Sequence, residues 1–313
     1  MIDSRLHVLR MLAAHGTVTA TARALHYTPS AVSHQLRGLA EDLGVVLLIP
    51  QGRGVRLTPA ARILLSQADD LFARWETIKA LITSESGEHA GELRLCGFST
   101  AAAALLPPVV TALRSWRPEL EVRIIEADPL ECFDLLLAEE ADLAVIVATD
   151  TVPATADGRF DQQFLLDDPL DLLVPDGHPL AQRAWITLRE TAEESWIVDR
   201  PNRPHRQLVF TSCAEAGFTP TVAHEAVEWD TGAALVAAGF GVSLVPRLAR
   251  MPAGYATTRV PLRGDPAPSR HIRTVVRRGS RSQPLLASAL EVLGETAAGV
   301  HALDTSPPLP ASG

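Results

Sequence analysis

The chain has 313 residues, of which 47% are hydrophobic and 21% charged, as in an ordinary globular protein of two or three compact units. Its net charge of −9 argues against a protein that coats nucleic acid over its whole surface. Residues 1–60 nevertheless hold six arginines and three acidic residues, a net +3, so the remaining residues carry −12. This asymmetry predicts a nucleic-acid-binding head on an acidic body.

The cysteines and the first residues indicate the compartment. Cys96, Cys132 and Cys213 are far apart and lack Cys-x-x-Cys spacing, so we expect reduced, buried thiols. The N-terminal residues include charges where a signal peptide has an apolar run. No segment approaches the ~20 apolar residues of a membrane span. We therefore expect a cytoplasmic protein that does not contact the membrane.

The first two predicted elements are helices. Apolar residues at helical spacing over residues 2–12 predict the first helix, which ends at Gly16. A second, shorter helix begins after Thr17 or Thr19 as its N-cap. Small alanines on its inner face permit a close helix crossing. A turn then leads to a third helix, and two helices joined in this way predict a helix-turn-helix.

The third helix has the stronger signals. Thr28 is a good N-cap, Pro29 suits the first helical position, and the pattern continues to Leu43. Short side chains at the leading end let a helix approach base edges, and its amides favour phosphate oxygens. We expect this helix to bind DNA through Thr28, Pro29 and four residues on its polar face: Ser30, Ser33, His34 and Arg37.

A two-stranded wing follows. Residues 45–49 and 55–57 are expected to be strands joined by a turn, with Arg53 and Arg56 reaching the flanking DNA backbone or minor groove. These elements complete a winged helix-turn-helix domain over residues 1–58. A three-helix structural bundle with solvated arginines remains an alternative.

Residues 17–44 (TVTATARALHYTPSAVSHQLRGLAEDLG) resemble the signature of LysR-type transcriptional regulators. Leu57-Thr58-Pro59-Ala60 is similar to the family's link into its next helix. The wing departs from the family, because Pro50-Gln51 stands where an arginine is common, so we expect its backbone contact to be either weaker or shifted to Arg53. The resemblance implies a transcription regulator that binds double-stranded DNA.

A linker helix is predicted over residues 59–87. Its apolar residues are spaced alternately by three and four, which predicts a self-associating seam. The seam residues are Ala61, Leu64, Ala68, Leu71, Trp75, Ile78 and Ile82. A dimer or tetramer would present its heads to two-fold related half-sites on DNA. The alternative is a helix packed on its own domain.

The body, residues 91–300, alternates strands with helices, which predicts βαβ units and a parallel sheet. Strands are expected at 93–98, 121–125, 142–147, 170–174, 196–198, 242–245 and 272–276. The main helices are expected at 101–114, 130–139, 206–216, 231–238 and 283–293. This pattern resembles the two-lobed, periplasmic-binding-protein-like effector domain of the LysR family. Lobe I is expected at about 91–163 and 268–300, lobe II at about 164–267, and a disordered tail at 301–313.

In such a fold a small molecule is expected in the crevice beyond the strand ends. The candidate effector-binding residues are Ser99, Thr100, Thr149, Asp199, Arg200, Asp230 and Thr231. Ser99 and Thr100 open a helix, so their hydroxyls and neighbouring amides suit a carboxylate or similar organic anion. A plain N-cap role for each, and solvent exposure for Arg200, remain alternatives.

Catalytic patterns are lacking. The sequence has no P-loop and no G-x-S-x-G elbow, and Gly239-Phe240-Gly241 lacks the third glycine of a dinucleotide fingerprint. Histidines and cysteines show no zinc-ligand spacing. We expect neither enzymatic activity nor a cofactor or metal. The competing hypothesis is a non-regulatory small-molecule-binding protein or enzyme that carries a helical head. The expected fold class is an all-α winged helix-turn-helix and linker helix followed by an α/β two-lobed effector domain.

Overall fold

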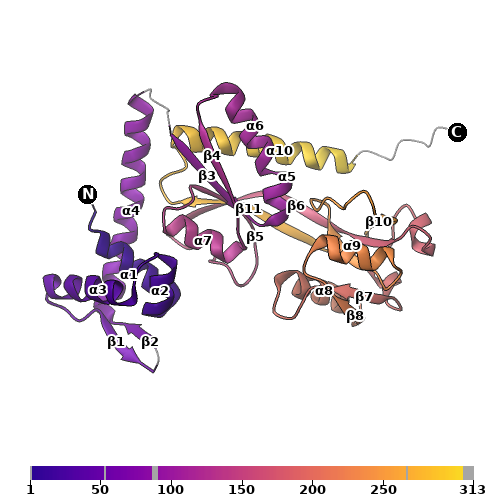
Figure 1. Cartoon of the computed structure of the whole chain (residues 1–313), viewed down its shortest axis with the longest axis horizontal. Coiled ribbons are helices and arrows are strands. Elements are labelled where there is room, and N and C mark those ends of the chain that lie inside the picture. The colour runs from indigo at the N-terminus through magenta and orange to yellow at the C-terminus, as the bar shows by residue number, and fades with distance from the viewer. Residues whose placement is uncertain (1, 53, 87–90, 266, 306–313) are drawn as a thin grey trace. The chain divides into compact units, whose positions relative to one another are not determined.

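The computed structural model describes residues 2–52, 54–86, 91–265 and 267–305. The chain divides into two compact units (Figure 1). The first comprises Met1–Ile146, Asp150–Gln163 and Arg273–Gly313, and so contains the head, the linker helix and lobe I. The second comprises Val147–Thr149 and Phe164–Ile272, which is lobe II.

The head has the predicted order of elements. Helices α1 (Ser4–His15), α2 (Val18–Ala24) and α3 (Pro29–Leu43) precede strands β1 (Leu48–Gln51) and β2 (Gly54–Leu57). The strands pair antiparallel and form the wing. One face of each helix packs into a small core. The head is therefore a winged helix-turn-helix, as expected.

Local signals define the helix ends. Thr17 and Thr28 each accept a hydrogen bond at 3.2 Å from the amide three residues on, so both are N-caps. Gly16 and Gly44 end their helices in the left-handed conformation, with φ of 71° and 64°. The predicted caps Gly16, Thr17 and Thr28 are confirmed.

The first wing strand begins later than predicted. Val45 and Val46 are exposed and lie before β1, whereas Leu47 is buried in the head core. Thr58 explains the shift, because its amide donates to Leu47 O at 3.0 Å and its hydroxyl to Val46 O at 2.8 Å. The apolar run is thereby anchored to the start of the next helix before pairing begins.

That helix is α4 (Pro59–Ser86), the linker helix. Its first turns pack on the head, where Ala61 is fully buried and Leu64 and Leu65 contact the core. In Figure 1 the head surrounds one end of α4.

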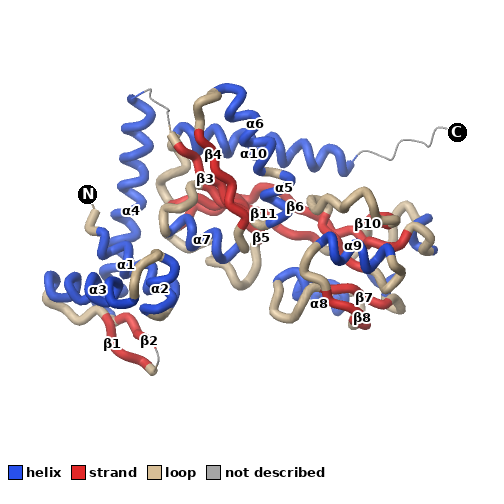
Figure 2. Tube along the Cα trace, in the orientation of Figure 1, coloured by secondary structure: helices blue, strands red, loops and turns tan. Residues whose placement is uncertain are grey.

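Lobe I is built on parallel strands. β3 (Glu92–Gly97) lies between β4 (Glu121–Glu126) and β5 (Leu143–Val147). Strand β11 (Ser269–Arg277) is the next neighbour of β5. Figure 2 shows these strands in red among the helices of the lobe.

The helices of lobe I are α5 (Ser99–Ala104), α6 (Leu106–Trp116), α7 (Pro129–Leu137) and α10 (Pro284–Thr305). α7 contributes the largest share of a buried apolar cluster with β3 and β5. α6 and α10 pack against each other. The helix α10 ends at Thr305, and residues 306–313 of the predicted disordered tail lie outside the described part.

Lobe II contains antiparallel and parallel pairs. The long strand β6 (Phe160–Pro175) pairs antiparallel with β9 (Ser243–Pro246) and β10 (Thr257–Pro261). β7 (Ser195–Val198) pairs parallel with β8 (Thr221–Glu225). The helical elements are α8 (Pro204–Glu215), α9 (Trp229–Ala237) and the short 3₁₀ helices Pro179–Gln182 and Leu188–Thr191.

Strands β8 and β10 were not predicted. The side chains of β8 are mostly exposed and those of β10 mostly half-buried, so neither has a clean two-residue alternation.

Candidate nucleic-acid interface

A four-residue turn sets the relation of α2 to α3. His26 adopts a left-handed φ of 53° in this turn, and the Tyr27 amide donates to Ala22 O at 2.8 Å. A histidine tolerates this conformation better than a β-branched residue would. The turn directs the first residues of α3 away from the head core.

The leading end of α3 is polar and exposed. Thr28 Oγ1 caps the helix and lies 3.0 Å from Ser30 Oγ, and Pro29 occupies the first turn. On the opposite side Val32 and Leu36 are buried in the core. Exposed hydroxyls are therefore presented at the positive end of the helix dipole.

The remaining residues predicted on α3 follow the same face. His34 and Arg37 are exposed, and Ser33 is half-buried. The first turn contains no acidic residue. Glu41 and Asp42 lie in the last turns, so their negative charge is removed from the end that would meet DNA.

Not all head arginines are available. Arg5 binds Asp3 and Asp42, each at 2.7 Å. Arg10 is buried, lies 3.6 Å from Asp69 Oδ1 and stacks over the Phe72 ring at 4.1 Å, and burial lowers its pKa. These two guanidinium groups stabilise the head and its junction with α4, so the count of six overstates the basic surface.

The structure describes one of the two arginines predicted to act in the wing. Arg56 is exposed on β2, whereas Arg53 lies outside the described residues. Pro50 is opposite Val55 in the ladder, so a residue without an amide donor lies in an edge strand, where it is tolerated.

Two exposed residues were missed. Tyr27 is 49% exposed and directly precedes the N-cap of α3. Arg23 is exposed in the last turn of α2. The sequence signal for Tyr27 was an aromatic residue directly before a helix N-cap. An aromatic residue that belonged to the globular core would be buried, so one exposed at this place is a candidate contact residue.

The predicted seam of α4 divides into two parts. Ala61 and Ala68 are buried, and Leu64 packs on the head, so this part contributes to its own domain. Farther along, Leu71, Trp75 and Ile82 are 47%, 39% and 61% exposed, while Ile78 is half-buried. The exposed part of the predicted seam is therefore the second half of α4.

The candidate effector-binding residues lie in both units. In lobe I, Ser99 is exposed and Thr100 is buried. Both lie within α5, and Phe98 is its capping residue, so the plain N-cap role does not apply. In lobe II, Thr149 is half-buried, whereas Arg200, Asp230 and Thr231 are exposed.

Asp199 has an organising role. Its carboxylate accepts the Arg200 amide at 2.7 Å and Arg203 Nε at 3.3 Å, and its carbonyl accepts Arg206 Nη1 at 2.7 Å. The side chain is largely buried. It therefore fixes the loop between β7 and α8.

The first turn of α8 also holds a histidine that sequence reasoning did not select. His205 Nε2 lies 3.1 Å from Leu244 O, and the ring meets Trp229 edge to face at 5.0 Å. Burial, with the nearby Arg270 charge, lowers the pKa of His205 to about 4. The ring is therefore neutral at physiological pH, and Nε2 is the donor to the carbonyl.

The described residues contain no cluster of three or more His, Cys, Asp or Glu side chains able to hold a metal. In the same residues, no helix has the length and hydropathy to cross a membrane.

Comparisons with known proteins agree with this architecture. The family described as "Bacterial regulatory helix-turn-helix protein, lysR family" matches residues 4–62, and that described as "LysR substrate binding domain" matches residues 86–298. The chain belongs to the LysR-type transcriptional regulators. It is accordingly a transcription regulator with a DNA-binding head and an effector-binding domain.

Individual LysR relatives cover most of the chain. TtuA of Agrobacterium vitis, an HTH-type transcriptional regulator, is 32% identical over 77% of this chain and 79% of its own. A hydrogen peroxide-inducible genes activator of Escherichia coli is 28% identical over 88% and 89%. The solved structure of the full-length OxyR C199D variant from Pseudomonas aeruginosa has a TM-score of 0.63 at 24% identity, covering 95% of this chain and 94% of that one.

Proposed function

We propose that this LysR-type regulator reads double-stranded DNA with the leading end of α3, presented in pairs by self-association of α4. The observation that carries the proposal is the exposed, acid-free first turn of α3, where Thr28, Ser30 and the helix dipole coincide. Arg37 lies farther along the same helix and is exposed. Guanidinium groups so placed contact guanine edges or phosphates.

The test is fluorescence anisotropy with the region upstream of the gene and with a shuffled duplex. Replacing Arg37 or Ser33 by alanine should cost about 1–3 kcal/mol on the upstream DNA and much less on the shuffled DNA. Arg74→Ala is the matched control, because Arg74 is an exposed arginine on α4. Equal weakening on both duplexes would assign phosphate contacts instead, and no binding by the unaltered protein would refute the proposal.

We further propose that the effector is a small organic anion. Support comes from Arg200, which is exposed in the loop organised by Asp199, and from the Thr231 hydroxyl in the first turn of α9. An anion that binds only the folded protein raises stability by about 2.7 kcal/mol at one hundred times its dissociation constant. Thermal-shift assays of the full chain with mono- and dicarboxylates should therefore find a stabilising compound.

Arg200→Gln should abolish that thermal shift, while Arg183→Gln, an exposed arginine elsewhere in lobe II, should preserve it. An unchanged shift in Arg200→Gln would remove Arg200 from the site. A neutral compound as the sole stabiliser would refute the anion class.

Peroxide, named for one relative, is not proposed as the signal. Reaction with peroxide requires an accessible thiolate. Cys96, Cys132 and Cys213 are all fully buried. A hydrogen bond with Cys132 and burial both raise the pKa of Cys96, and burial raises that of Cys213 to about 12. These thiols are suited to packing.

A further inference from the structure

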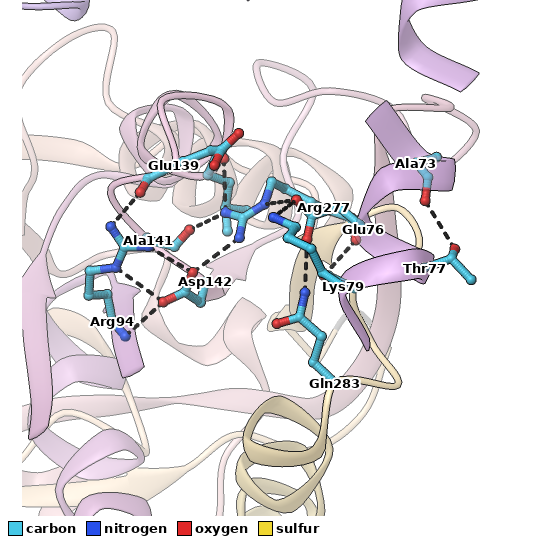
Figure 3. Close-up of polar contacts among 12 residues, drawn as sticks. Ala73, Glu76, Thr77, Lys79, Arg94, Glu139, Ala141, Asp142, Arg277 and Gln283 are labelled. Carbon is cyan, nitrogen blue, oxygen red and sulfur yellow. Dashed lines mark hydrogen bonds and ion pairs between the residues drawn. The ribbon is translucent and has the colours of Figure 1, made fainter. Parts of the chain in front are cut away.

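The linker helix carries a buried carboxylate on the side that faces lobe I. Glu76 is only 4% exposed. Its Oε2 accepts Gln283 Nε2 at 2.9 Å, and its Oε1 lies 2.5 Å from Lys79 Nζ and 3.4 Å from Arg277 Nε (Figure 3). A buried charge is costly without such partners. Two of the three partners belong to lobe I, so the charge of Glu76 is balanced across the junction of helix and lobe.

Arg277, at the end of β11, connects this carboxylate to the rest of the lobe. Its guanidinium donates to Ala141 O at 2.5 Å, to Leu136 O at 3.2 Å and to Asp142 Oδ1 at 3.1 Å. The side chain is 7% exposed. One rigid, planar group thus holds α4, the end of α7 and the start of β5 in fixed relation.

The contacts continue on the far side of Asp142. Arg94 of β3 binds its carboxylate through Nε at 3.1 Å and Nη2 at 3.0 Å. Burial alone would raise the pKa of Asp142, but the Arg94 and Arg277 contacts hold it below the ordinary value. Arg94 also donates to the carbonyl of Glu139, in the turn after α7. The network in Figure 3 therefore reaches from α4 to three elements of lobe I.

A backbone contact reinforces the same junction. Gly279 follows β11 with φ of +89°, and a Cβ there would overlap Ala73 O and lie 2.8 Å from Thr77 Oγ1, both on α4. Any other residue would push the turn off the helix. The ion pairs of Glu76 and the close packing of Gly279 are thus two independent interactions that hold the same junction.

We propose that Glu76, Arg277 and Gly279 form a clamp that sets the orientation of α4 on lobe I. Arg277 is its positioning residue, since its guanidinium contacts both Glu76 and the α7–β5 turn. The clamp rests on the proposed function in one respect: because α4 carries the head, the orientation of α4 determines where paired heads meet DNA. A displacement of the α7–β5 turn then reaches the head through Arg277.

The direct test measures distance in the full-length protein. Nitroxide labels are placed at Ser66→Cys on α4 and Glu126→Cys on β4, both exposed positions, with excess unlabelled protein so that each oligomer carries one labelled chain. Glu76→Gln removes the charge, and Gly279→Ala inserts the Cβ. Both should shift or broaden the distance distribution between the labels.

Matched controls separate the clamp from general strain. Gly239→Ala imposes a similar positive φ of +78° with no atom within 4 Å of the new Cβ. Asp70→Asn removes an ion pair with Arg278 that also joins α4 to lobe I, but both side chains are exposed, so solvent screens the pair and it contributes little. Both controls should keep the parent distribution. A parent distribution in both Glu76→Gln and Gly279→Ala would overturn the clamp, whether or not the protein binds the upstream DNA.

Coupling is tested by a double-mutant cycle on DNA affinity. Glu76→Gln and Asp142→Asn should each change affinity for the upstream DNA by about 2- to 30-fold, the range for residues on a coupling route. The double variant should change the affinity by less than the product of the two single fold-changes, because both substitutions act through Arg277. Multiplicative effects would show that Arg277 does not link them and would overturn its positioning role.

Discussion

Thr58 joins the wing to the linker helix, and its hydroxyl is the group to remove. The side chain is 6% exposed, donates to Val46 O at 2.8 Å and accepts the Ala61 amide at 3.1 Å. Thr58→Val preserves the shape and deletes both bonds. Losing the cap costs about 1 kcal/mol, and losing the part-buried hydrogen bond to the Val46 carbonyl adds up to about 1 kcal/mol. The expected local destabilisation is about 2 kcal/mol.

Hydrogen exchange of the full chain measures this locally. A loss of about 2 kcal/mol should accelerate exchange of the Ala61 amide and its neighbours about 30-fold, with amides of lobe II unchanged. Thr58→Ser retains the hydroxyl and should exchange within a few-fold of the parent. If Thr58→Val also stayed within a few-fold, the hydroxyl would not hold the wing to α4 and the energetic reasoning would be wrong.

Three further predictions concern the linker helix, the thiols and pH. The double variant Leu71→Glu, Ile82→Glu should weaken self-association by about 3 kcal/mol per dimer, roughly a hundredfold, as measured by sedimentation velocity. Ser66→Glu, at an exposed polar position of the same helix, is the control. Unchanged association in the double variant would exclude this face of α4 as the interface. In the native protein Cys213 and the other two cysteines should not react with a maleimide that labels all three after unfolding. Rapid labelling of the native protein would contradict their burial. Because the folded pKa of His205 is lowered to about 4, the unfolded state binds more protons between pH 6.5 and 4, so the free energy of unfolding should fall by up to about 1.4 kcal/mol per pH unit as pH decreases through that window. His205→Phe should flatten this slope in denaturant titrations, and an equally steep slope in that variant would place the proton elsewhere.

Much of the head was predictable because its signals are local. Thr17, Thr28, Gly16 and Gly44 act on amides and carbonyls within a few residues, so their spacing alone locates the helix ends. The alternation of strands and helices in the body likewise predicted an α/β domain. The residues proposed for DNA contact on α3 follow from the same periodicity.

What the sequence could not supply depends on neighbours distant along the chain. Arg5 and Arg37 cannot be distinguished by residue type, but folding places Asp42 beside Arg5 and leaves Arg37 exposed. Ala61 fits a dimer seam by spacing, yet the head core covers it. Burial and charge pairing are properties of three-dimensional surroundings, so composition and periodicity do not determine them.

The sequence by itself therefore determined the helices of the head, the class of the body and the family resemblance, because short-range hydrogen bonding and hydrophobic period are written in adjacent residues. Only the tertiary structure decided which arginines remain available and how α4 is held. Arg277 meets Asp142 across 135 positions, and Gln283 meets Glu76 across 207. Contacts between residues so far apart in the chain follow no periodic pattern in the sequence, since the fold can bring residues together at any spacing.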